Sequence, residues 1–358
     1  MDLASQSVTP TLVIRADATT AIGTGHVMRC LAIAQEWKRR GGRVVFVTHC
    51  EIDSILRRIE HAVGPPVRLE SHHPSPSDLE STLAVLGPDV AALVLDGYHF
   101  DAEYEAAVRL AGTFVMTVDD EGERPTFEAD MVLNQNIEAP DLQYNVPEGG
   151  IRLLGTRYAL LRSEFSEFVR RERFYPFQAR NVLVTIGGAD PDNHTLAVLR
   201  VLDIVHGAVK ERIDVTVVVG GANPNRVELE AEIARARYAA TLAVDVSDMP
   251  RRMAEADVVI SAAGTSIWEL CYMGVPSLVM AVADNQIGLA RGAAAAGAVV
   301  SLGDARRLDV ASVASVVGEL IGDKARRVSL SEHAVTLVDG KGSQRVVDAL
   351  LSASEARG

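Results

Sequence analysis

The chain has 358 residues, 48% of them hydrophobic, and a formal net charge of −13. This length suits two domains of ordinary size, and the negative charge argues against broad binding to nucleic-acid phosphates. No apolar run reaches the roughly 18 residues that span a bilayer, and the first ten residues lack the pattern of a signal peptide. The sequence therefore predicts a cytoplasmic protein that binds neither nucleic acid nor membrane, as a monomer or a weak homo-oligomer.

Short β-branched runs alternate with longer helical patterns from residue 11 onward, which predicts βαβ units and a parallel sheet. Strands are expected at residues 11–18, 43–49, 67–70, 91–100, 113–120 and 131–136. The first helix, 25–40, is expected to end at Gly41-Gly42, since glycine readily adopts the left-handed conformation that closes a helix. A second helix is expected around 54–63, and the spacing of Ser77 and Glu80 predicts a capping box that opens a third.

The segment 139–178 changes character and is predicted to end one domain and lead to the next. After it the alternation resumes, with strands expected at residues 180–190, 214–221, 241–246, 257–264, 276–282 and 298–303. Two consecutive α/β sheets predict two Rossmann-like domains with parallel sheets that face a cleft. Ligands of such sheets bind at the carboxyl ends of the strands, so the polar residues that follow strands are the candidates for a site.

The loop Gly23-Thr24-Gly25-His26 follows the first strand and opens the first helix. Its glycines let the backbone turn tightly and approach a ligand. His26 falls in the first turn of the helix, whose positive end favours a neutral imidazole, the form that suits a general base. A histidine that only caps the helix or satisfies a hydrogen bond fits the residues equally well.

A loop of small residues also opens a helix in the second half, within the segment 261–270. The free amides at Gly264, Thr265 and Ser266 predict an anion site suited to a diphosphate. One turn into the helix, Glu269 is either an acceptor for two ribose hydroxyls or a solvated carboxylate.

Two further strand ends of the second half carry candidate residues. Asn285 and Gln286 offer amide groups to a sugar or phosphate, or else cap a helix. The pair Gly187-Gly188 either lets the backbone approach phosphates or forms an ordinary turn between a strand and a helix.

Polar residues follow three strands of the first half, and half of them are expected to be turn and cap residues. They are Asp96, Tyr98, His99, Asp119, Asp120, Asn134, Gln135 and Asn136. His72 and His73 lie in a Pro/Ser-rich loop, where solvent exposure is expected. The three cysteines, Cys30, Cys50 and Cys271, fit no zinc or disulfide spacing. Neither a metal nor a cofactor is predicted.

These segments together resemble the nucleotide-sugar hydrolases of pseudaminic acid biosynthesis, which are relatives of the MurG-type glycosyltransferases. Those hydrolases remove UDP from UDP-2,4-diacetamido-2,4,6-trideoxy-β-L-altropyranose. The resemblance spans nearly the whole chain in the segments IRADATTAIGTGHVMRCLAIA, LDGYHF, VDDEGERPTFEADMVLNQN, LLGTRYALLRSEF, VLVTIGGADPDNHT, SAAGTSIWELCYMGVPSLVMAVADNQ and DGKGSQRVVDAL. The second-half segments are shared with MurG-like transferases. The combination of R-A-D…I-G-x-G-H-V-M-R with L-L-G-x-x-Y-x-L-L-R-x-E-F is more specific to the hydrolases.

The resemblance implies a GT-B fold with a catalytic, sugar-binding domain at 1–165, a nucleotide-binding domain at 166–342, and a helix at 343–358 that crosses back to the first domain. It implies that His26 is the general base and that Gly264, Thr265 and Ser266 meet the diphosphate, Glu269 the ribose and the loop near Val246 the uracil. In the expected mechanism, Asp17, Tyr98 and nearby polar strand ends orient the water or the N-acetyl groups. The other expected substrate-binding residues are Gly23, Gly25, Arg29, Gly187, Gly188, Asn285 and Gln286.

The expected reaction is hydrolysis of a UDP-linked amino or deoxy sugar by one displacement, with inversion at the anomeric carbon. Backbone amides and a helix end, rather than a metal, would stabilise the departing UDP. Two alternatives remain open. One is a glycosyltransferase that uses an organic acceptor in place of water, and the other is a protein that binds a nucleotide-sugar without catalysis.

Overall fold

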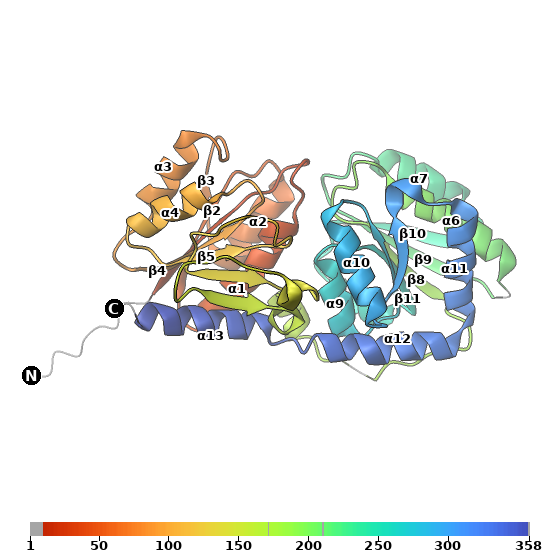
Figure 1. Cartoon of the computed structure of the whole chain (residues 1–358). Coiled ribbons are helices and arrows are strands. Elements are labelled where there is room, and N and C mark those ends of the chain that lie inside the picture. The colour runs from red at the N-terminus through yellow and green to blue at the C-terminus, as the bar shows by residue number, and fades with distance from the viewer. Residues whose placement is uncertain (1–9, 171, 210, 357–358) are drawn as a thin grey trace, which may run out of the picture. The chain divides into compact units, whose positions relative to one another are not determined.

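The computed structural model describes residues 10–170, 172–209 and 211–356. The chain divides into two compact units, and each has its own sheet with helices on its faces (Figure 1). The first unit runs to Ser163 and includes the chain again from Lys341, and the second unit is Glu164–Gly340.

The first unit is built on seven parallel strands in the order β3-β2-β1-β4-β5-β6-β7. The strands are β1 (Thr11–Ala16), β2 (Arg43–Thr48), β3 (Val67–Arg68), β4 (Val90–Asp96), β5 (Val115–Val118), β6 (Met131–Asn134) and β7 (Ile151–Leu154). Every residue of β1 is buried, as expected of a central parallel strand covered on both faces. The strand order reverses between β1 and β4, so this unit has a topological switch point where their carboxyl ends meet.

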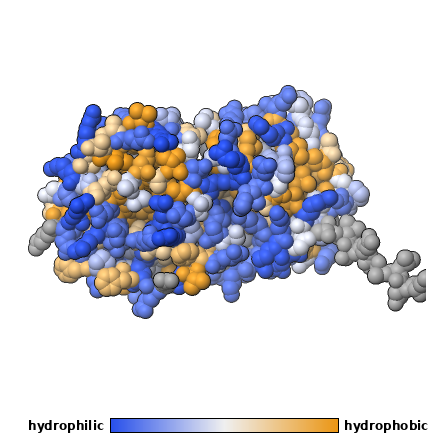
Figure 2. Space-filling model, turned by 180° about the vertical axis from the view of Figure 1, so that it is seen from behind, coloured by the Kyte–Doolittle hydropathy of each residue, from blue (hydrophilic) through white to orange (hydrophobic). Residues whose placement is uncertain are grey.

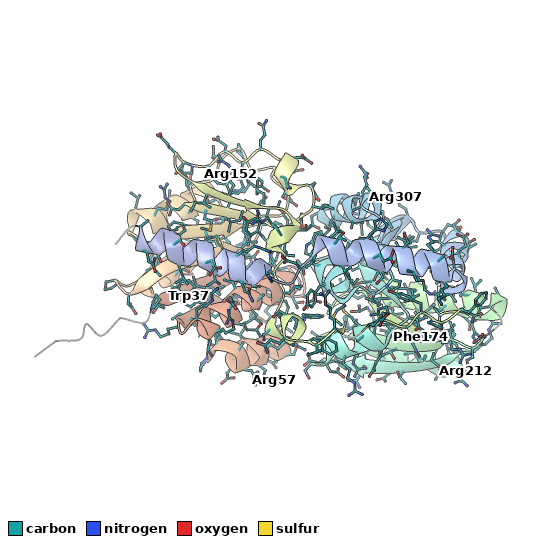
Figure 3. All side chains as sticks on the ribbon, turned by 90° about the horizontal axis from the view of Figure 1, so that it is seen from below. Trp37, Arg57, Arg152, Phe174, Arg212 and Arg307 are labelled. Atoms are coloured by element: carbon teal, nitrogen blue, oxygen red, sulfur yellow. The ribbon has the colours of Figure 1, made fainter. Side chains whose placement is uncertain are left out.

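The helices of the first unit cover both faces of its sheet (Figure 1). They are α1 (Gly25–Arg39), α2 (Asp53–Val63), α3 (Pro76–Ala84), α4 (Ala102–Leu110) and α13 (Gly342–Glu355), with 3-10 turns η1 (Ala139–Asp141) and η2 (Thr156–Tyr158). The predicted end of α1 is confirmed, since Gly41 has a φ of +87°. Helix α13 packs against α1, on which Trp37 lies (Figure 3).

Two predictions for this unit are wrong. The segment 139–178 is not only a connection, because Ile151–Leu154 forms β7 and pairs in parallel with β6. Ser77 opens no capping box, because α3 begins one residue earlier at Pro76 and its N-cap is Ser75. Proline suits that first helical position because its fixed φ matches the helix and its missing N–H would have had no partner there.

The second unit has six parallel strands in the order β10-β9-β8-β11-β12-β13. The strands are β8 (Asn181–Thr185), β9 (Asp214–Val219), β10 (Ala239–Val244), β11 (Val258–Ala262), β12 (Ser277–Ala281) and β13 (Val300–Asp304). The helices are α6 (His194–Ala208), α7 (Arg226–Arg235), α8 (Met249–Glu255), α9 (Ser266–Met273), α10 (Asn285–Ala295), α11 (Val310–Gly322) and α12 (Lys324–Leu337); α5 (Ser163–Ser166) and the turn η3 (Ala305–Arg307) complete the elements. The switch point of this unit lies between β8 and β11.

Each unit has its own apolar core, as two separate sheets require. Seen from behind, hydrophilic residues cover much of the surface of each unit, and each also shows apolar patches among these residues (Figure 2). Within the described part of the chain, no helix combines the length and the apolar character that a bilayer span requires.

Candidate functional site

His26 lies at the switch point of the first unit. The chain leaves β1 and makes a tight turn in which the N–H of Gly23 donates to the carbonyl of Thr19 at 2.9 Å. Gly23 has a φ of +82°, which explains the glycine at this position. Helix α1 then begins at Gly25, which makes His26 its second residue, and the side chain is 6% exposed.

The imidazole of His26 is oriented by a carboxylate from the neighbouring strand. Its Nδ1 lies 2.7 Å from Oδ1 of Asp96, the last residue of β4. An ionised carboxylate only accepts hydrogen bonds, so Nδ1 carries the proton and Nε2 holds the lone pair in the neutral ring. This tautomer is the one that a general base needs to take a proton at Nε2.

Arg29, one turn further along α1, joins Asp96 to a second carboxylate. Its Nε and Nη2 donate to the two oxygens of Asp96 at 2.6 and 2.7 Å, and its Nη1 donates to Asp120 at 2.6 Å. The hydroxyl of Tyr98 donates to the other oxygen of Asp120 at 2.8 Å. The Tyr98 ring stands edge-on to the ring of His26, with centroids 4.8 Å apart. These five residues form a closed loop of contacts, which we call the His26 cluster.

The charges in the His26 cluster keep Asp96 ionised. Burial alone would raise the pKa of Asp96, but the positive charge of Arg29 and the hydrogen bonds from Arg29 and His26 hold it well below its usual range. Burial and the same carboxylate raise the pKa of the Cys30 thiol, which donates to Asp96 at 3.3 Å. Cys30 therefore stays a neutral thiol beside the carboxylate.

The side chains of Asp17 and Arg29, which were expected to contact water or substrate, are buried and directed at other protein groups. Asp17 is fully buried, is bonded to Arg15 and to the N–H of His49, and lies 3.0 Å from Nε2 of His99, so it belongs to a neighbouring cluster. Arg29 is 3% exposed, and its nitrogens are directed at the two carboxylates. Tyr98, by contrast, is half exposed beside His26.

Several other strand ends of the first unit serve its structure. Asp119 accepts hydrogen bonds from the N–H groups of Glu121 and Gly122, which is turn chemistry. The hydroxyl of Tyr144 donates to Asp119 at 2.9 Å and accepts from Asn134 at 2.6 Å. Burial raises the pKa of Asp119.

The sequence-based choice of site residues missed Asp96, the partner of His26, and Asp120, which binds Arg29 and Tyr98. Both were noted as polar strand ends, but nothing in their spacing separates them from turn residues such as Asp119. The signal that identifies Asp96 is topological. Asp96 ends β4, the strand that pairs with β1 across the switch point. It therefore lies where the chain leaves β1 and turns into α1, which carries His26.

The predicted nucleotide-binding residues of the second unit follow β8, β10, β11 and β12, at the carboxyl edge of its sheet. Helix α9 begins at Ser266, with Thr265 as its N-cap. The carbonyls of Gly264 and Thr265 already accept from Ile267 and Trp268, so the preceding amides lie outside the helical ladder. The start of this eight-residue helix therefore presents N–H groups at the switch point between β8 and β11.

Loops on neighbouring strands come close to this helix start. Nε2 of Gln286 is the nearest atom to the open face of Gly264, 3.6 Å from where a Cβ would stand, and its Oε1 accepts from the N–H of Val282. After β8, Gly187 has a φ of +98°. Gly188 accepts from the N–H of Gly220 at 2.9 Å, which ties the β8 and β9 loops together.

The remaining predicted residues lie in the segments that follow β11, β12 and β10. Glu269 is partly buried in the first turn of α9, and Asn285 is the first residue of α10. Val246 follows β10 after Asp245, which has a φ of +51°.

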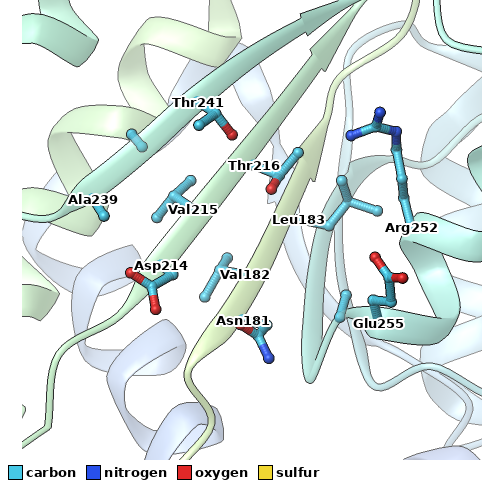
Figure 4. Close-up of a pocket in the computed structure, with 12 residues that line it drawn as sticks. Asn181, Val182, Leu183, Asp214, Val215, Thr216, Ala239, Thr241, Arg252 and Glu255 are labelled. Atoms are coloured by element: carbon cyan, nitrogen blue, oxygen red, sulfur yellow. The ribbon is translucent and has the colours of Figure 1, made fainter.

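A separate hollow of about 340 Å³ lies elsewhere in the second unit (Figure 4). It is lined by the first residues of β8, β9 and β10 and by Arg252 and Glu255 of α8. These are the amino ends of the strands, opposite the edge that carries the glycine loops. We therefore do not assign it to the nucleotide. Among the described residues, no group of three or more His, Cys, Asp or Glu side chains is arranged to hold a metal ion.

The chain is similar in sequence to proteins that act on nucleotide sugars or build polysaccharides, and part of it matches a known family model. Residues 182–342 match the glycosyltransferase family 28 C-terminal domain. The chain is 26% identical over 336 residues to the spore coat polysaccharide biosynthesis protein SpsG of Bacillus subtilis, across 93% of this chain and 95% of that protein. It is 24% identical over 280 residues to the UDP-2,4-diacetamido-2,4,6-trideoxy-beta-L-altropyranose hydrolase of Campylobacter jejuni, across 77% and 93% of the two chains.

The fold has close counterparts among solved structures. MurG of Acinetobacter baumannii superposes with a TM-score of 0.65 at 16% identity, across 96% of this chain and all of that one. Two α/β units with sheets of seven and six parallel strands are the architecture of that protein class. The chain therefore has the GT-B fold of glycosyltransferase-like proteins, and the match to the family 28 C-terminal domain falls almost entirely in its second unit.

Proposed function

We propose that the protein hydrolyses a UDP-linked sugar, with His26 as the general base that activates water. The observation that carries this proposal is the pair His26–Asp96 at the switch point of the first unit. Because Asp96 fixes the proton on Nδ1, Nε2 of His26 is ready to accept a proton. An imidazole that served only to cap α1 would not need a carboxylate of its own.

The nucleotide is assigned to the second unit. The helix start at Gly264, Thr265 and Ser266 offers amides to the diphosphate, and Glu269 offers a carboxylate to the ribose. Support comes from the family 28 C-terminal domain, which covers these loops, and from the hydrolase of Campylobacter jejuni, whose name specifies a UDP-sugar.

The reaction is a single displacement at the anomeric carbon. Nε2 of His26 takes a proton from water while the water oxygen forms a bond to that carbon. The bond between the carbon and the diphosphate oxygen breaks on the opposite face, and its electron pair leaves with UDP. Attack from one face and departure from the other invert the configuration. By similarity to the Campylobacter jejuni protein, the sugar is a diacetamido-trideoxyhexose.

The net charge of the His26 cluster favours this step. Arg29 supplies one positive charge, and Asp96 and Asp120 supply two negative charges. As His26 takes the proton it becomes positive, and the excess negative charge around it stabilises that state.

A glycosyl transfer to an organic acceptor is the second candidate. The family 28 domain and the similarity to MurG favour it, since both belong to transferases. In that reaction His26 would take its proton from an acceptor hydroxyl in place of water. A protein that binds the nucleotide-sugar without turning it over would have no use for the His26–Asp96 pair.

The test is an NMR time course of a UDP-sugar with the protein and no acceptor. Free sugar and UDP should accumulate, and the first sugar anomer to appear should be inverted. His26→Ala should lower the rate about a hundred- to ten-thousand-fold while UDP affinity is retained. The control is His61→Ala, an exposed histidine on α2, which should leave the rate unchanged. A stable UDP-sugar that is consumed only after an acceptor is added would support the transferase instead.

A further inference from the structure

Three histidines from three loops lie in a row in the first unit, outside the His26 cluster. His49 follows β2, His72 lies between β3 and α3, and His99 follows β4 (Figure 1). The ring centroids of His49 and His72 are 5.5 Å apart, and those of His72 and His99 are 5.3 Å apart, with the rings tilted by 58° and 60°. We call this row the histidine ledge. The proton transfer at His26 does not use it.

The buried carboxylate of Asp17 contacts two residues of the ledge, His49 and His99. One oxygen of this buried carboxylate accepts from the N–H of His49 at 2.6 Å, and the other lies 3.0 Å from Nε2 of His99. Burial alone would raise the pKa of Asp17, but the bonds from His99 and Arg15 hold it well below its usual range. Asp17 is therefore an ionised anchor for two of the three loops.

The third loop is held through Asp78. Arg15 is bonded to both Asp17 and Asp78, and all three side chains are fully buried. Asp78 also accepts from the N–H of His73 at 2.8 Å, which fixes the residue next to His72. A buried group of one cation and two carboxylates is costly unless every charge is partnered. Here the partners are the three loops that carry the ledge.

Two rings of the ledge have their proton positions set by neighbouring carbonyls. Nδ1 of His49 donates to the carbonyl of Leu69 at 3.1 Å, and Nδ1 of His72 donates to the carbonyl of His73 at 2.6 Å. A carbonyl only accepts, so in the neutral ring of His72 Nε2 is left as a hydrogen-bond acceptor, whereas Nε2 of His49 lies 3.9 Å from a carboxylate oxygen of Glu51. His72 is exposed and His49 is partly exposed, so a ligand can reach both rings.

We propose that the histidine ledge is the subsite that selects the sugar, with Nε2 of His72 accepting from an amide N–H on the sugar ring and the neighbouring ring of His49 completing the surface. This rests on the proposed function of the protein as a nucleotide-sugar enzyme. An acetamido N–H is a donor and cannot accept, so it matches an acceptor whose tautomer is fixed. The tilted imidazole faces also offer apolar area to the C–H groups of a pyranose.

The ledge is also in the right place for this role. Tyr98 contacts the ring of His26, and the next residue in the chain is His99. A sugar whose anomeric carbon faces His26 would extend its ring substituents along Tyr98 toward the ledge. Asp17, which holds the ledge, directly follows β1, and Asp96, which orients His26, ends β4, the strand that pairs with β1.

The kinetic test compares UDP-N-acetylglucosamine with UDP-glucose, which differ only by the acetamido group at C2. The wild-type protein should prefer the acetamido sugar. His72→Phe keeps a ring of similar shape but removes the acceptor, and it should reduce the ratio of the two kcat/KM values roughly three- to tenfold. The pH profile of kcat should stay the same, because His26 is untouched. His61→Phe on the exposed face of α2 is the matched control and should leave the ratio unchanged.

A binding measurement separates the ledge from the hydrolase proposal. In protein labelled with ¹⁵N-histidine, N-acetylglucosamine alone should shift the Nε2 signals of His49 and His72, and UDP alone should not. If these shifts occur but no UDP-sugar is cleaved, the sugar subsite is supported and the hydrolase proposal is wrong. If UDP-sugars are cleaved with the same preference by His72→Phe and by His49→Phe, the ledge is wrong and the hydrolase stands. The proposal of a sugar subsite is also wrong if N-acetylglucosamine leaves these histidine signals unshifted.

Discussion

Asp96 is the residue on which the catalytic proposal depends. It receives hydrogen bonds from His26, Arg29 and Cys30, and it is fully buried. A carboxylate in that setting orients an imidazole because each of its oxygens is already fixed by a second donor. The histidine then has one tautomer and one ring orientation available.

Asp96→Asn should abolish this control of the tautomer. Arg29 donates to both oxygens of Asp96, so the NH₂ of the Asn would meet an N–H of Arg29 in either orientation. With that NH₂ toward His26, Nδ1 would become an acceptor and the proton would move to Nε2. Turnover should fall by a factor on the order of 10²–10⁴, with UDP affinity retained. The measurement is kcat from UDP release, together with ¹⁵N NMR of the imidazole of His26, which reports the tautomer directly.

Asp120→Asn is the matched control for this substitution. It removes a carboxylate that also binds Arg29, yet it leaves the bond between His26 and Asp96 in place. Because Asp120 also supplies one of the two negative charges near His26, we expect a loss of about tenfold from the altered hydrogen bond and the missing charge, which is smaller than the loss in Asp96→Asn. Equal losses in the two variants, or an unchanged His26 tautomer in Asp96→Asn, would contradict the orienting role.

At the scale of elements, the sequence predicted the longer β-branched strands and missed the short strand β7. Strands such as β1 and β9 carry β-branched runs that bury both faces, and they were expected close to their observed bounds. β7 was missed because its four residues follow a glycine pair and lie in a proline-containing segment. β7 belongs to the sheet because it pairs with β6, and this pairing cannot be recognised from the local sequence pattern.

The residues of the candidate site that are consecutive in the chain were predicted, and their partners from distant segments were not. The turn before His26 was readable because glycines, histidine and helix start are consecutive in the chain. The partner of His26 is 70 positions away, and no local rule joins them. The histidine ledge was hidden for the same reason. His72 was expected to be exposed, as it is, but its alignment with His49 and His99 is a property of three strand ends together.

Helix α13 depends on close contact at its first residue. A Cβ on Gly342 would lie 2.1 Å from the carbonyl oxygen of Ala159 and 2.6 Å from the carbonyl carbon of Tyr158, both backbone atoms. Gly342→Ala should therefore displace the start of α13 and destabilise the first unit by about 1–3 kcal/mol. Urea unfolding measures this, and Trp37 reports the first unit when Trp268, the other tryptophan, is replaced by Phe.

Gly318→Ala in the same background is the control. Gly318 lies inside α11, and a Cβ there would meet no atom within 4 Å. Alanine favours helix over glycine by about 1 kcal/mol, so this variant should be neutral or slightly stabilised in the second unit. Equal stability of the first unit in both variants would show that α13 tolerates a side chain at its start.

At the scale of the whole molecule, the chain passes between the units twice and is secured to the second unit soon after the first passage. Arg173 donates to the carbonyls of Ala256 and Met253, next to and within the last turn of α8. Arg327 donates to the carbonyl of Leu320 near the end of α11 and to that of Pro176. Arginines at helix ends satisfy carbonyls that have no partner within the helix. The connecting segment therefore belongs structurally to the second unit.

This two-unit organisation predicts that nucleotide and sugar protect different parts of the chain. In His26→Ala protein, which cannot turn substrate over, UDP should slow amide exchange in residues 185–190, 261–270 and 283–287. At a hundred times its Kd, UDP stabilises the bound state by about 2.7 kcal/mol, which corresponds to roughly hundredfold slower exchange for amides that open only when it leaves. The intact UDP-sugar should add protection at residues 17–30 and 96–100, and α13 serves as the internal reference. Hydrogen exchange with mass spectrometry resolves these segments. Protection of residues 17–30 by UDP alone would mean that the nucleotide binds the first unit.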